Sequence, residues 1–412
     1  MSKNNKDFFT EKKEWSKTKD SLLGSYLKPY FTKILSTGNP VIYIDSFAGA
    51  GKYGDSTFGS PIIALETVNS VLKITKTQGA SRLIELVFVE KSHYDDLCKN
   101  INSYIEEHNG IQPKIIQGCH EEQLIKALEN KKEYNVFLYI DPFGVKQLDF
   151  ALFEKLSEME FSSIELLVNF NSYGFFRWAC SALNVDVHAS FSDESHCDDI
   201  SFPTNANEAN VTKIAGGSYW KYIILRYKHR KITAHVAESQ IALLYKRRLM
   251  KCFRYALDIP LRAKSGHPPK YRMFHVCNHH EGCYLMAEDM QKRSHELSLI
   301  IQKEETQDLF DFSGCTKALH DGEHVESSKV RKDILSIISH FKHLRYKELV
   351  ARYVVEYGLI NDFKIIRNHL ENLTQEGIVK IDREPLYTKT GKLSSFWSDT
   401  KKEKVYIVFI ES

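Results

Sequence analysis

Apolar positions along the chain follow two different periods. In residues 11–36 they recur every three or four positions, which predicts one amphipathic helix. From residue 41 onward, short runs rich in β-branched and aromatic residues alternate with segments of helical period. The runs are 41–45, 85–90, 114–118, 136–141 and 164–170, and the helices between them are expected at 61–72, 94–107 and 121–130. Runs that are apolar on both faces suit buried parallel strands, so the pattern predicts an α/β fold with a Rossmann-like, doubly wound sheet.

The alternation of strands and helices stops after Arg177. The polar stretch 180–218 predicts a loop or insertion, and two helices are expected around 218–229 and 238–254. Two strands, 254–264 and 271–279, should then pair antiparallel at the edge of the sheet. The last part of the chain predicts three helices (328–341, 346–356, 361–376) and two strands (377–382, 404–410). Three short helices followed by a hairpin are the plan of a winged helix.

These patterns divide the chain into four parts. They are an N-terminal helical extension (1–40), an α/β domain (41–300) with a basic helical insertion at about 178–254, a linker (301–326) and a winged-helix domain (327–412).

Composition narrows the class of protein. The chain has 412 residues, 42% of them hydrophobic and 26% charged, which is typical of a globular protein of two or three domains. No apolar run of about 18 residues occurs, so we expect no membrane-spanning helix and no membrane partner. The polar N-terminus does not resemble a secretory signal, and the eight cysteines are scattered. Reduced thiols and a cytoplasmic location are therefore expected.

The small net charge of +3 hides a basic segment. Between residues 221 and 254 there are ten Lys or Arg and a single acidic residue, Glu238, with tyrosines interleaved. Cationic side chains neutralise phosphates and aromatic rings stack on unpaired bases, so the segment favours nucleic acid over the alternative of a solvated helix face. The candidate contacts are Arg226, Lys228, Arg230, Lys246, Arg247, Arg248 and Lys251, joined by Lys364 and Arg367 on the third helix of the predicted winged helix. A winged helix also serves as a protein-docking module, and both interpretations stay open.

The loop after the first strand reads D-S-F-A-G-A-G. Its glycines let the backbone approach a ligand, and an acidic side chain at a strand end can bind an amino or hydroxyl group. A simple strand-to-helix turn is the structural alternative. The third glycine of a dinucleotide-binding loop is absent, because Tyr53 stands there, and no triphosphate-binding G-K-[ST] occurs. The candidate ligand-binding residues are Asp45, Phe47, Ala48, Gly49 and Gly51.

Later strand ends add candidates. Glu90 ends the second strand, where a carboxylate can hold two ribose hydroxyls. Cys119 and His120 follow the third strand, where an adenine edge can be read. The structural alternative for each is a polar residue that merely ends a strand.

The fourth strand ends in Asp141-Pro142-Phe143-Gly144. A carboxylate and a proline carbonyl can accept both hydrogens of a flat exocyclic amine, and the ring of Phe143 can stack on the base that carries it. Asp141, Pro142 and Phe143 are therefore the candidate catalytic residues, with a strand-end turn as the alternative.

No metal site is predicted. Cys277, His279, His280 and Cys283 are near one another, but five residues separate the two cysteines and no second half-site follows.

These motifs resemble known families. The D-x-F-A-G-x-G loop with an acidic second-strand end is similar to class I S-adenosylmethionine-dependent methyltransferases. Over residues 15–300, DSFAGAGKYG, GSP, FVEK, IDPFG and LLVNF resemble the three-Cys-motif partner protein family. That resemblance implies a methyltransferase-like domain at 41–300, S-adenosyl-L-methionine as cofactor, and a three-Cys-motif protein similar to radical S-adenosylmethionine enzymes as partner. The D-P-F-G tetrad also resembles the amine-acceptor motif of tRNA guanine-N2 methyltransferases; Phe143 departs from the D-P-P-Y motif of adenine-N6 enzymes.

The function expected from the sequence is methyl transfer to an exocyclic base amine in RNA or DNA. A non-catalytic module that binds cofactor and nucleic acid is one alternative. A metal-dependent nuclease is another, since Asp45, Glu90 and Asp141 are all acidic.

Overall fold

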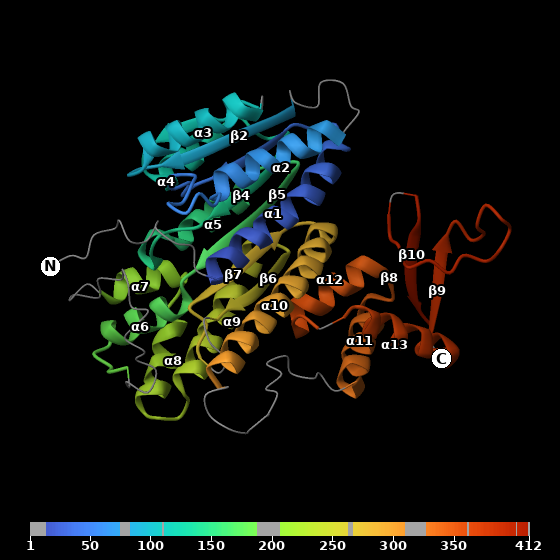
Figure 1. The fold of residues 1–412 in the computed structure, drawn as a ribbon. Coiled ribbons are helices and arrows are strands. Elements are labelled where there is room, and N and C mark those ends of the chain that lie inside the picture. Colours follow the sequence, from blue (N-terminus) through green and yellow to red (C-terminus); the bar gives the residue numbers. More distant parts are fainter. Residues whose placement is uncertain are drawn as a thin grey trace.

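The computed structural model describes residues 14–74, 83–108, 111–187, 207–262, 267–309, 327–360, 362–400 and 402–410. Figure 1 shows helices on both faces of a central sheet, with a smaller unit formed by the C-terminal elements. Within the described part of the chain, the helices that are long enough to cross a membrane are not apolar enough to do so.

The central sheet has seven strands in the order β3-β2-β1-β4-β5-β7-β6. They are β1 (Val41–Asp45), β2 (Ile84–Glu90), β3 (Lys114–Gln117), β4 (Asn135–Ile140), β5 (Ser163–Phe170), β6 (Tyr255–Leu261) and β7 (Tyr271–Cys277). The first five strands are parallel, and β7 runs antiparallel to both of its neighbours. The strand order reverses between β1 and β4, the place where ligands bind in sheets of this kind. The predicted doubly wound α/β fold is confirmed.

Two hydrophobic clusters cover the two faces of this sheet. One contains α1 (Glu14–Leu35), α2 (Ser60–Ile74), α3 (Tyr94–His108) and α10 (His280–Leu309). The other contains α4 (His120–Leu128), α5 (Phe150–Glu158), α6 (Ser172–Ala182), α7 (Glu208–Ala215), α8 (Tyr219–Lys228) and α9 (Ala234–Cys252). A short 3-10 turn, η3 (Val145–Gln147), joins β4 to α5.

Helix α1 is a layer of the α/β core. Its side chains Tyr26 and Tyr30 are buried and lie 5.8 and 5.0 Å from the ring of Phe137 in β4, centroid to centroid. The sequence-based division into an extension at 1–40 does not describe this packing, because the apolar stripe of the helix covers the sheet itself.

The predicted insertion is also packed. Helices α6, α8 and α9 contact one another on the second face, α9 begins at Ala234 rather than 238, and α7 was not expected. Residues 188–206 of the predicted loop lie outside the described residues. The linker predicted from residue 301 begins within α10, which continues to Leu309.

A buried ion-pair network joins α9 to the edge strands. Arg272 of β7 donates to both carboxylate oxygens of Glu238, at 2.6 and 2.9 Å, and to Asp258 of β6 at 2.7 Å. Lys246 lies 3.6 Å from the other oxygen of Asp258. The one acidic residue of the basic segment, and one of its lysines, are therefore structural.

The C-terminal unit comprises α11 (Ser327–Phe341), β8 (His343–Arg345), α12 (Tyr346–Tyr357), α13 (Lys364–Gln375), β9 (Val379–Glu384) and β10 (Lys404–Phe409). Its antiparallel sheet has the order β8-β10-β9. The three expected helices and the two expected strands are present, together with the short β8; the assignment as a winged helix stays a prediction. The core of this unit is continuous with that of the α/β part, because α12 packs on α10.

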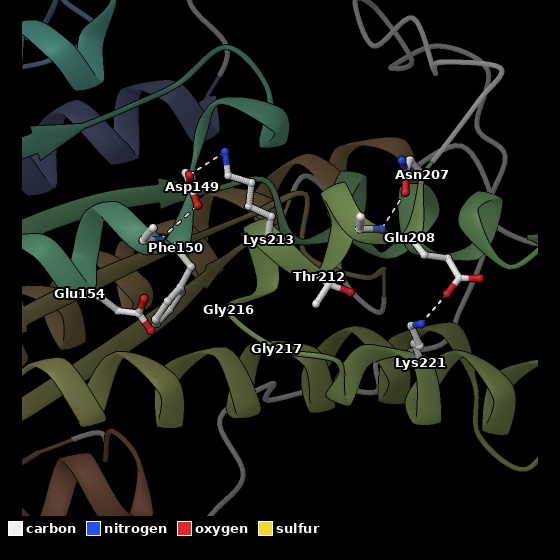
Figure 2. A pocket seen from close by; sticks show the side chains of 12 residues that line it. Asp149, Phe150, Glu154, Asn207, Glu208, Thr212, Lys213, Gly216, Gly217 and Lys221 are labelled. Carbon is white, nitrogen blue, oxygen red and sulfur yellow. Dashed lines mark hydrogen bonds and ion pairs between the residues drawn. The ribbon is translucent and has the colours of Figure 1, made fainter.

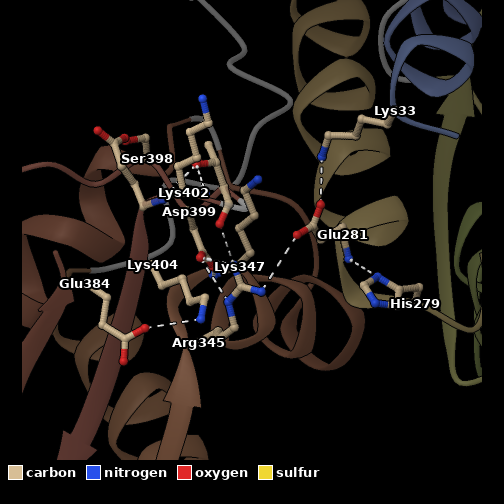
Figure 3. A network of polar contacts seen from close by, with 12 residues as sticks. Lys33, His279, Glu281, Arg345, Lys347, Glu384, Ser398, Asp399, Lys402 and Lys404 are labelled. Carbon is tan, nitrogen blue, oxygen red and sulfur yellow. Dashed lines mark hydrogen bonds and ion pairs between the residues drawn. The ribbon is translucent and has the colours of Figure 1, made fainter. Parts of the chain in front are cut away.

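Figure 3 shows polar contacts at this junction. Arg345 donates to the buried carboxylate of Asp399 with its Nε at 3.0 Å, and it lies 3.9 Å from Glu281 of α10. Glu281 in turn pairs with Lys33 of α1 at 2.9 Å. Asp399 also accepts from the backbone N–H of Lys347 at 3.4 Å. Three segments that are far apart in the sequence therefore meet here.

Replacing Asp399 with alanine should lower the free energy of unfolding by about 2–3 kcal/mol, because Arg345 and the Lys347 N–H lose a buried acceptor. Urea denaturation measures this value. Lys404→Ala, at the exposed pair with Glu384, is the matched control and should leave the free energy of unfolding nearly unchanged. Equal destabilisation of the two variants would contradict the structural role of Asp399.

Candidate functional site

Polar side chains gather at the carboxyl ends of four neighbouring strands. Asp45 ends β1, Glu90 ends β2, Asp141 directly follows β4, and Asn169 is the second-last residue of β5. Asp45, Glu90 and Asn169 are buried and Asp141 is partly buried. The sequence predicted the three acids. It missed Asn169, although its position at the end of the fifth apolar run was a usable signal.

The loop after β1 requires its glycines. Gly49 and Gly51 have φ angles of +60° and +77°. A Cβ on Gly51 would lie 3.0 Å from the Leu97 side chain, and one on Gly59 would lie 3.1 Å from the Gly51 carbonyl oxygen. The loop folds back on itself, since the Gly59 N–H donates to that same oxygen at 2.9 Å. Ala48 is buried and its N–H donates to the Val89 carbonyl oxygen. The predicted loop is therefore also a tight strand-to-helix turn.

Glu90 holds this loop in place. Its carboxylate accepts backbone N–H groups from Gly49 at 2.8 Å, Ser92 at 2.7 Å and His93 at 3.1 Å. A carboxylate has about four lone-pair positions. One position remains for a ligand hydroxyl, so the predicted ribose contact coexists with a supporting role that the sequence did not reveal.

Asp45 has an unsatisfied buried oxygen. Its Oδ1 accepts the Phe47 N–H at 3.2 Å, while Oδ2 is buried without a hydrogen-bond partner. Burial, and to a smaller extent the charges of Asp141 and Glu90, raise its pKa to about 7 against the opposing hydrogen bonds from Ser60 and Phe47. Buried polar atoms normally have partners. Oδ2 therefore marks a position suited to a ligand donor.

Asp141 is held by residues from two other elements. Its Oδ1 accepts from the side-chain amide of Asn169 at 2.7 Å, and its Oδ2 pairs with the ammonium of Lys19 in α1. Burial opposes the charge of Lys19, but Asp141, then Tyr53 and Asp20, raise the pKa of this ammonium well above its ordinary value. Lys19 was not predicted, because only the folded chain brings it to a residue so distant in sequence.

The remaining predicted residues line the same edge. Pro142 is buried, and the ring of Phe143 is 49% exposed beside it. The ring of His120 lies 4.3 Å from that of Phe47, while Cys119 is exposed. Burial lowers the pKa of His120, although a hydrogen bond with the Gln147 backbone opposes this shift.

Cys277 and Cys283 are inward-facing. The Cys277 thiol donates to the His279 carbonyl at 3.3 Å, and the Cys283 thiol to the Ala351 carbonyl at 3.9 Å. Burial raises the pKa of both thiols. Over the described ranges, no group of three or more His, Cys, Asp or Glu side chains is arranged to hold a metal ion.

The basic segment does not form one surface. Lys228, Arg230, Arg247 and Lys251 are exposed. Lys246 is turned inward to Asp258 and is 11% exposed. Arg248 lies over the Phe150 ring at 5.9 Å with its Nε buried, and Arg226 donates to Gln240 at 3.3 Å. Lys246 is thus misplaced as a predicted phosphate contact, because its helix face is the packed one.

The third helix of the C-terminal unit is similarly divided. Arg367 donates to the Tyr346 hydroxyl at 3.0 Å and lies over its ring, so it packs against α12; its role as a base or phosphate contact stays a prediction. Lys364 is exposed and lies 3.9 Å from Asp362.

A cavity of about 780 Å³ lies between α5, α7 and α8 (Figure 2). The predicted site residues do not line it. Lys213 pairs with Asp149 at 2.7 Å and Lys221 pairs with Glu208. These lining charges neutralise one another, so the cavity offers no evident binding chemistry.

By sequence, the chain matches no protein-family model and no curated protein. Similar solved structures include the putative methyltransferase yhhF from Escherichia coli, with 12% identity, 36% of this chain and 67% of that chain covered, and a TM-score of 0.23. The plantazolicin methyltransferase BamL, solved with an analogue of its desmethyl substrate and SAH, has 11% identity, 63% and 85% coverage, and a TM-score of 0.29. Trm1 from Pyrococcus horikoshii, solved with S-adenosyl-L-methionine, has 10% identity, 84% and 88% coverage, and a TM-score of 0.34. The TM-scores are low, so any functional assignment depends on the site itself.

The raised pKa of Asp45 predicts a pH-dependent stability. The folded protein keeps a proton on this carboxyl up to pH 7, whereas the unfolded chain releases it near pH 4. The stability contribution of Asp45 is therefore present at low pH and lost as the pH rises through 7. Relative to Asp45→Asn, the wild-type free energy of unfolding should fall by roughly 1.4 kcal/mol per pH unit across this interval. Parallel curves from urea denaturation would contradict the assignment.

Proposed function

We propose that the protein is an S-adenosylmethionine-dependent methyltransferase acting on an exocyclic amine of a nucleic-acid base. The observation that carries the proposal is the sheet order with β7 antiparallel between β5 and β6, combined with acids at the ends of β1, β2 and β4. The loop after β1 carries the D-x-F-A-G-x-G motif that resembles class I methyltransferases. Ligands of such sheets bind outside the carboxyl ends where the order reverses.

The residues at this edge fit the cofactor. S-adenosylmethionine carries an ammonium group, two ribose hydroxyls and an adenine ring. The unsatisfied Oδ2 of Asp45 suits the ammonium, the remaining lone pair of Glu90 suits a hydroxyl, and the Phe47–His120 pair offers flat surfaces for adenine. When bound, the cofactor would supply an electrophilic methyl group.

The chain's own residues would prepare the acceptor. Lys19 and Asn169 fix the Asp141 carboxylate, and Phe143 lies at the surface beside it. Asp141 and the Pro142 carbonyl would accept the amine hydrogens while Phe143 stacks on the base. The amine nitrogen would accept the methyl group as a neutral nucleophile, S-adenosylhomocysteine would be released, and the amine would lose its proton to solvent afterwards. The chain's own contribution would therefore be positioning and electrostatic contacts.

Nucleic acid would contact the exposed part of the basic segment. Lys228, Arg230, Arg247 and Lys251 are available for phosphates, and Tyr222 is 68% exposed for stacking. We include the C-terminal unit as a winged helix and a three-Cys-motif protein as partner, on the strength of the sequence pattern and resemblance.

A non-catalytic binding module is the second candidate. The ion pair with Lys19 already satisfies part of Asp141, which favours this alternative. The nuclease alternative is weaker. Glu90 is committed to three backbone N–H groups and Asp141 to Lys19 and Asn169, so neither carboxylate is arranged for metal ions.

Asp141→Asn should lower methyl transfer by about 10²–10³-fold, because an amide presents a donor where the target amine needs an acceptor. Affinity for S-adenosylhomocysteine should change little. The measurement is transfer from labelled cofactor to total RNA and DNA, followed by nucleoside mass spectrometry. Asp149→Asn is the matched control, since Asp149 only caps α5 and pairs with Lys213.

Full activity of Asp141→Asn would exclude the amine-acceptor role. If the wild type transfers no methyl group even with the three-Cys-motif partner present, the proposal of an enzyme is wrong and the non-catalytic binding module takes its place.

Replacing Lys228, Arg230, Arg247 and Lys251 with glutamine should weaken binding to single-stranded oligonucleotides. The salt dependence of log K should become shallower by roughly 0.7–0.9 for each phosphate that the variant no longer neutralises. Fluorescence anisotropy across a salt series measures both effects. Four exposed lysines elsewhere provide the control: Lys73, Lys99, Lys114 and Lys155. If both quadruple variants keep the wild-type slope, the basic segment does not bind nucleic acid.

A further inference from the structure

Lys19 is a buried cation in the first turns of α1, whereas the following turns of this helix are packed by apolar side chains. Ser16, Lys19 and Asp20 are buried in the first turns of α1, whereas Leu22, Leu23 and Tyr26 are buried in the next. A charge buried in this way is costly and is more often retained for function than for packing. The position of Lys19 therefore needs an explanation beyond the fold.

Acidic side chains lie near this ammonium. Burial is the main cause of the raised pKa of Tyr43 and Tyr139; the next cause is the charge of Asp45 for Tyr43 and the charge of Asp141 for Tyr139. Burial opposes the charge of Lys19, whereas the charges of Asp141 and Asp20 raise its pKa. The edge of the sheet formed by the carboxyl ends of its parallel strands thus contains one cation beside several hydrogen-bond acceptors.

Acceptors at the ends of β1 and β5 lack a donor. Asp45 Oδ2 and Asn169 Oδ1 are buried oxygens without hydrogen-bond partners. Buried acceptors in this state suit a ligand with several N–H donors, such as an ammonium group. A cation next to unsatisfied acceptors suits a zwitterionic ligand. The carboxylate of such a ligand would bind the cation, and its ammonium group would donate to the acceptors.

Helix α1 also closes over the loop that follows β1. The side chains of Ser16 and Tyr53 are hydrogen-bonded, which ties the first turns of the helix to the loop. The side chain of Lys19 is therefore enclosed between the Gly-rich loop and the end of β4.

We propose that Lys19 binds the carboxylate of the cofactor's amino-acid end, whose ammonium lies on Asp45 Oδ2 and Asn169 Oδ1. This assignment rests on the proposed function and adds α1 to the cofactor site. Without ligand, Lys19 pairs with Asp141; with ligand, Lys19 would gain a second anion, the ligand carboxylate, and Asp45 would gain a cation, the ligand ammonium.

Isothermal titration calorimetry on the full chain tests the assignment with two nucleosides. S-adenosylhomocysteine carries the amino-acid end, and 5′-methylthioadenosine lacks it. Lys19→Met should weaken the first by roughly 10–100-fold, the effect expected for removal of a charge-assisted hydrogen bond. It should change the second by less than about threefold, and Lys19→Arg should restore part of the affinity. Lys246→Met removes another inward-facing lysine from an ion pair and should change neither affinity.

A ligand-side comparison needs no substitution and decides the matter if Lys19→Met does not fold. Wild type should bind decarboxylated S-adenosylmethionine roughly 10–100-fold more weakly than S-adenosylmethionine, and Lys19→Met should abolish that difference. Equal binding by the wild type, or equal weakening of both nucleosides by Lys19→Met, overturns the assignment but leaves the cofactor intact. Absence of wild-type binding to every one of these nucleosides overturns the proposed function itself.

Discussion

The packing of α1 across one face of the sheet is the contact on which the candidate site and the C-terminal unit both depend. The helix has 22 residues and is therefore about 33 Å long. Its middle places Tyr26 and Tyr30 against Phe137, its first turns bring Lys19 to Asp141, and its last turn brings Lys33 to Glu281. Because the apolar contacts fix the position of a rigid rod, both polar ends are positioned by the same packing.

The sequence predicts what depends on local pattern. The buried strands, the glycine loop and the acids at strand ends follow from period and turn chemistry. Lys19 acts through a contact between distant segments, which no local pattern encodes, whereas Asn169 stands at a strand end that the pattern did mark. Lys246 and Arg367, which point inward, are a different case. Lys246 lies four residues after the buried Ala242 and three before the buried Leu249. Arg367 has the same spacing from the buried Phe363 and Leu370. These neighbours are buried, so helical period carried a signal that the charge count obscured.

The electrostatics of the carboxyl edge explain why so many of its acids have supporting partners. Burial, and to a smaller extent the charges of Asp141 and Glu90, raise the pKa of Asp45. Backbone N–H groups stabilise Glu90, and a cation stabilises Asp141. Asp45 has the weakest support, so it is the acid most sensitive to the arrival of a positively charged group.

The reversed direction of β7 separates the two halves of the molecule. Because β7 is antiparallel, its chain leaves the sheet at the edge opposite Asp45 and Asp141, and α10 begins there with Glu281 beside Arg345. The C-terminal unit is consequently anchored one strand length, about 20 Å, from the acidic edge. A single extended ligand in contact with both the junction at Glu281 and Arg345 and the acids at the opposite edge must therefore span at least about 20 Å. The shortest molecule that engages the whole protein is thus set by the length of a strand.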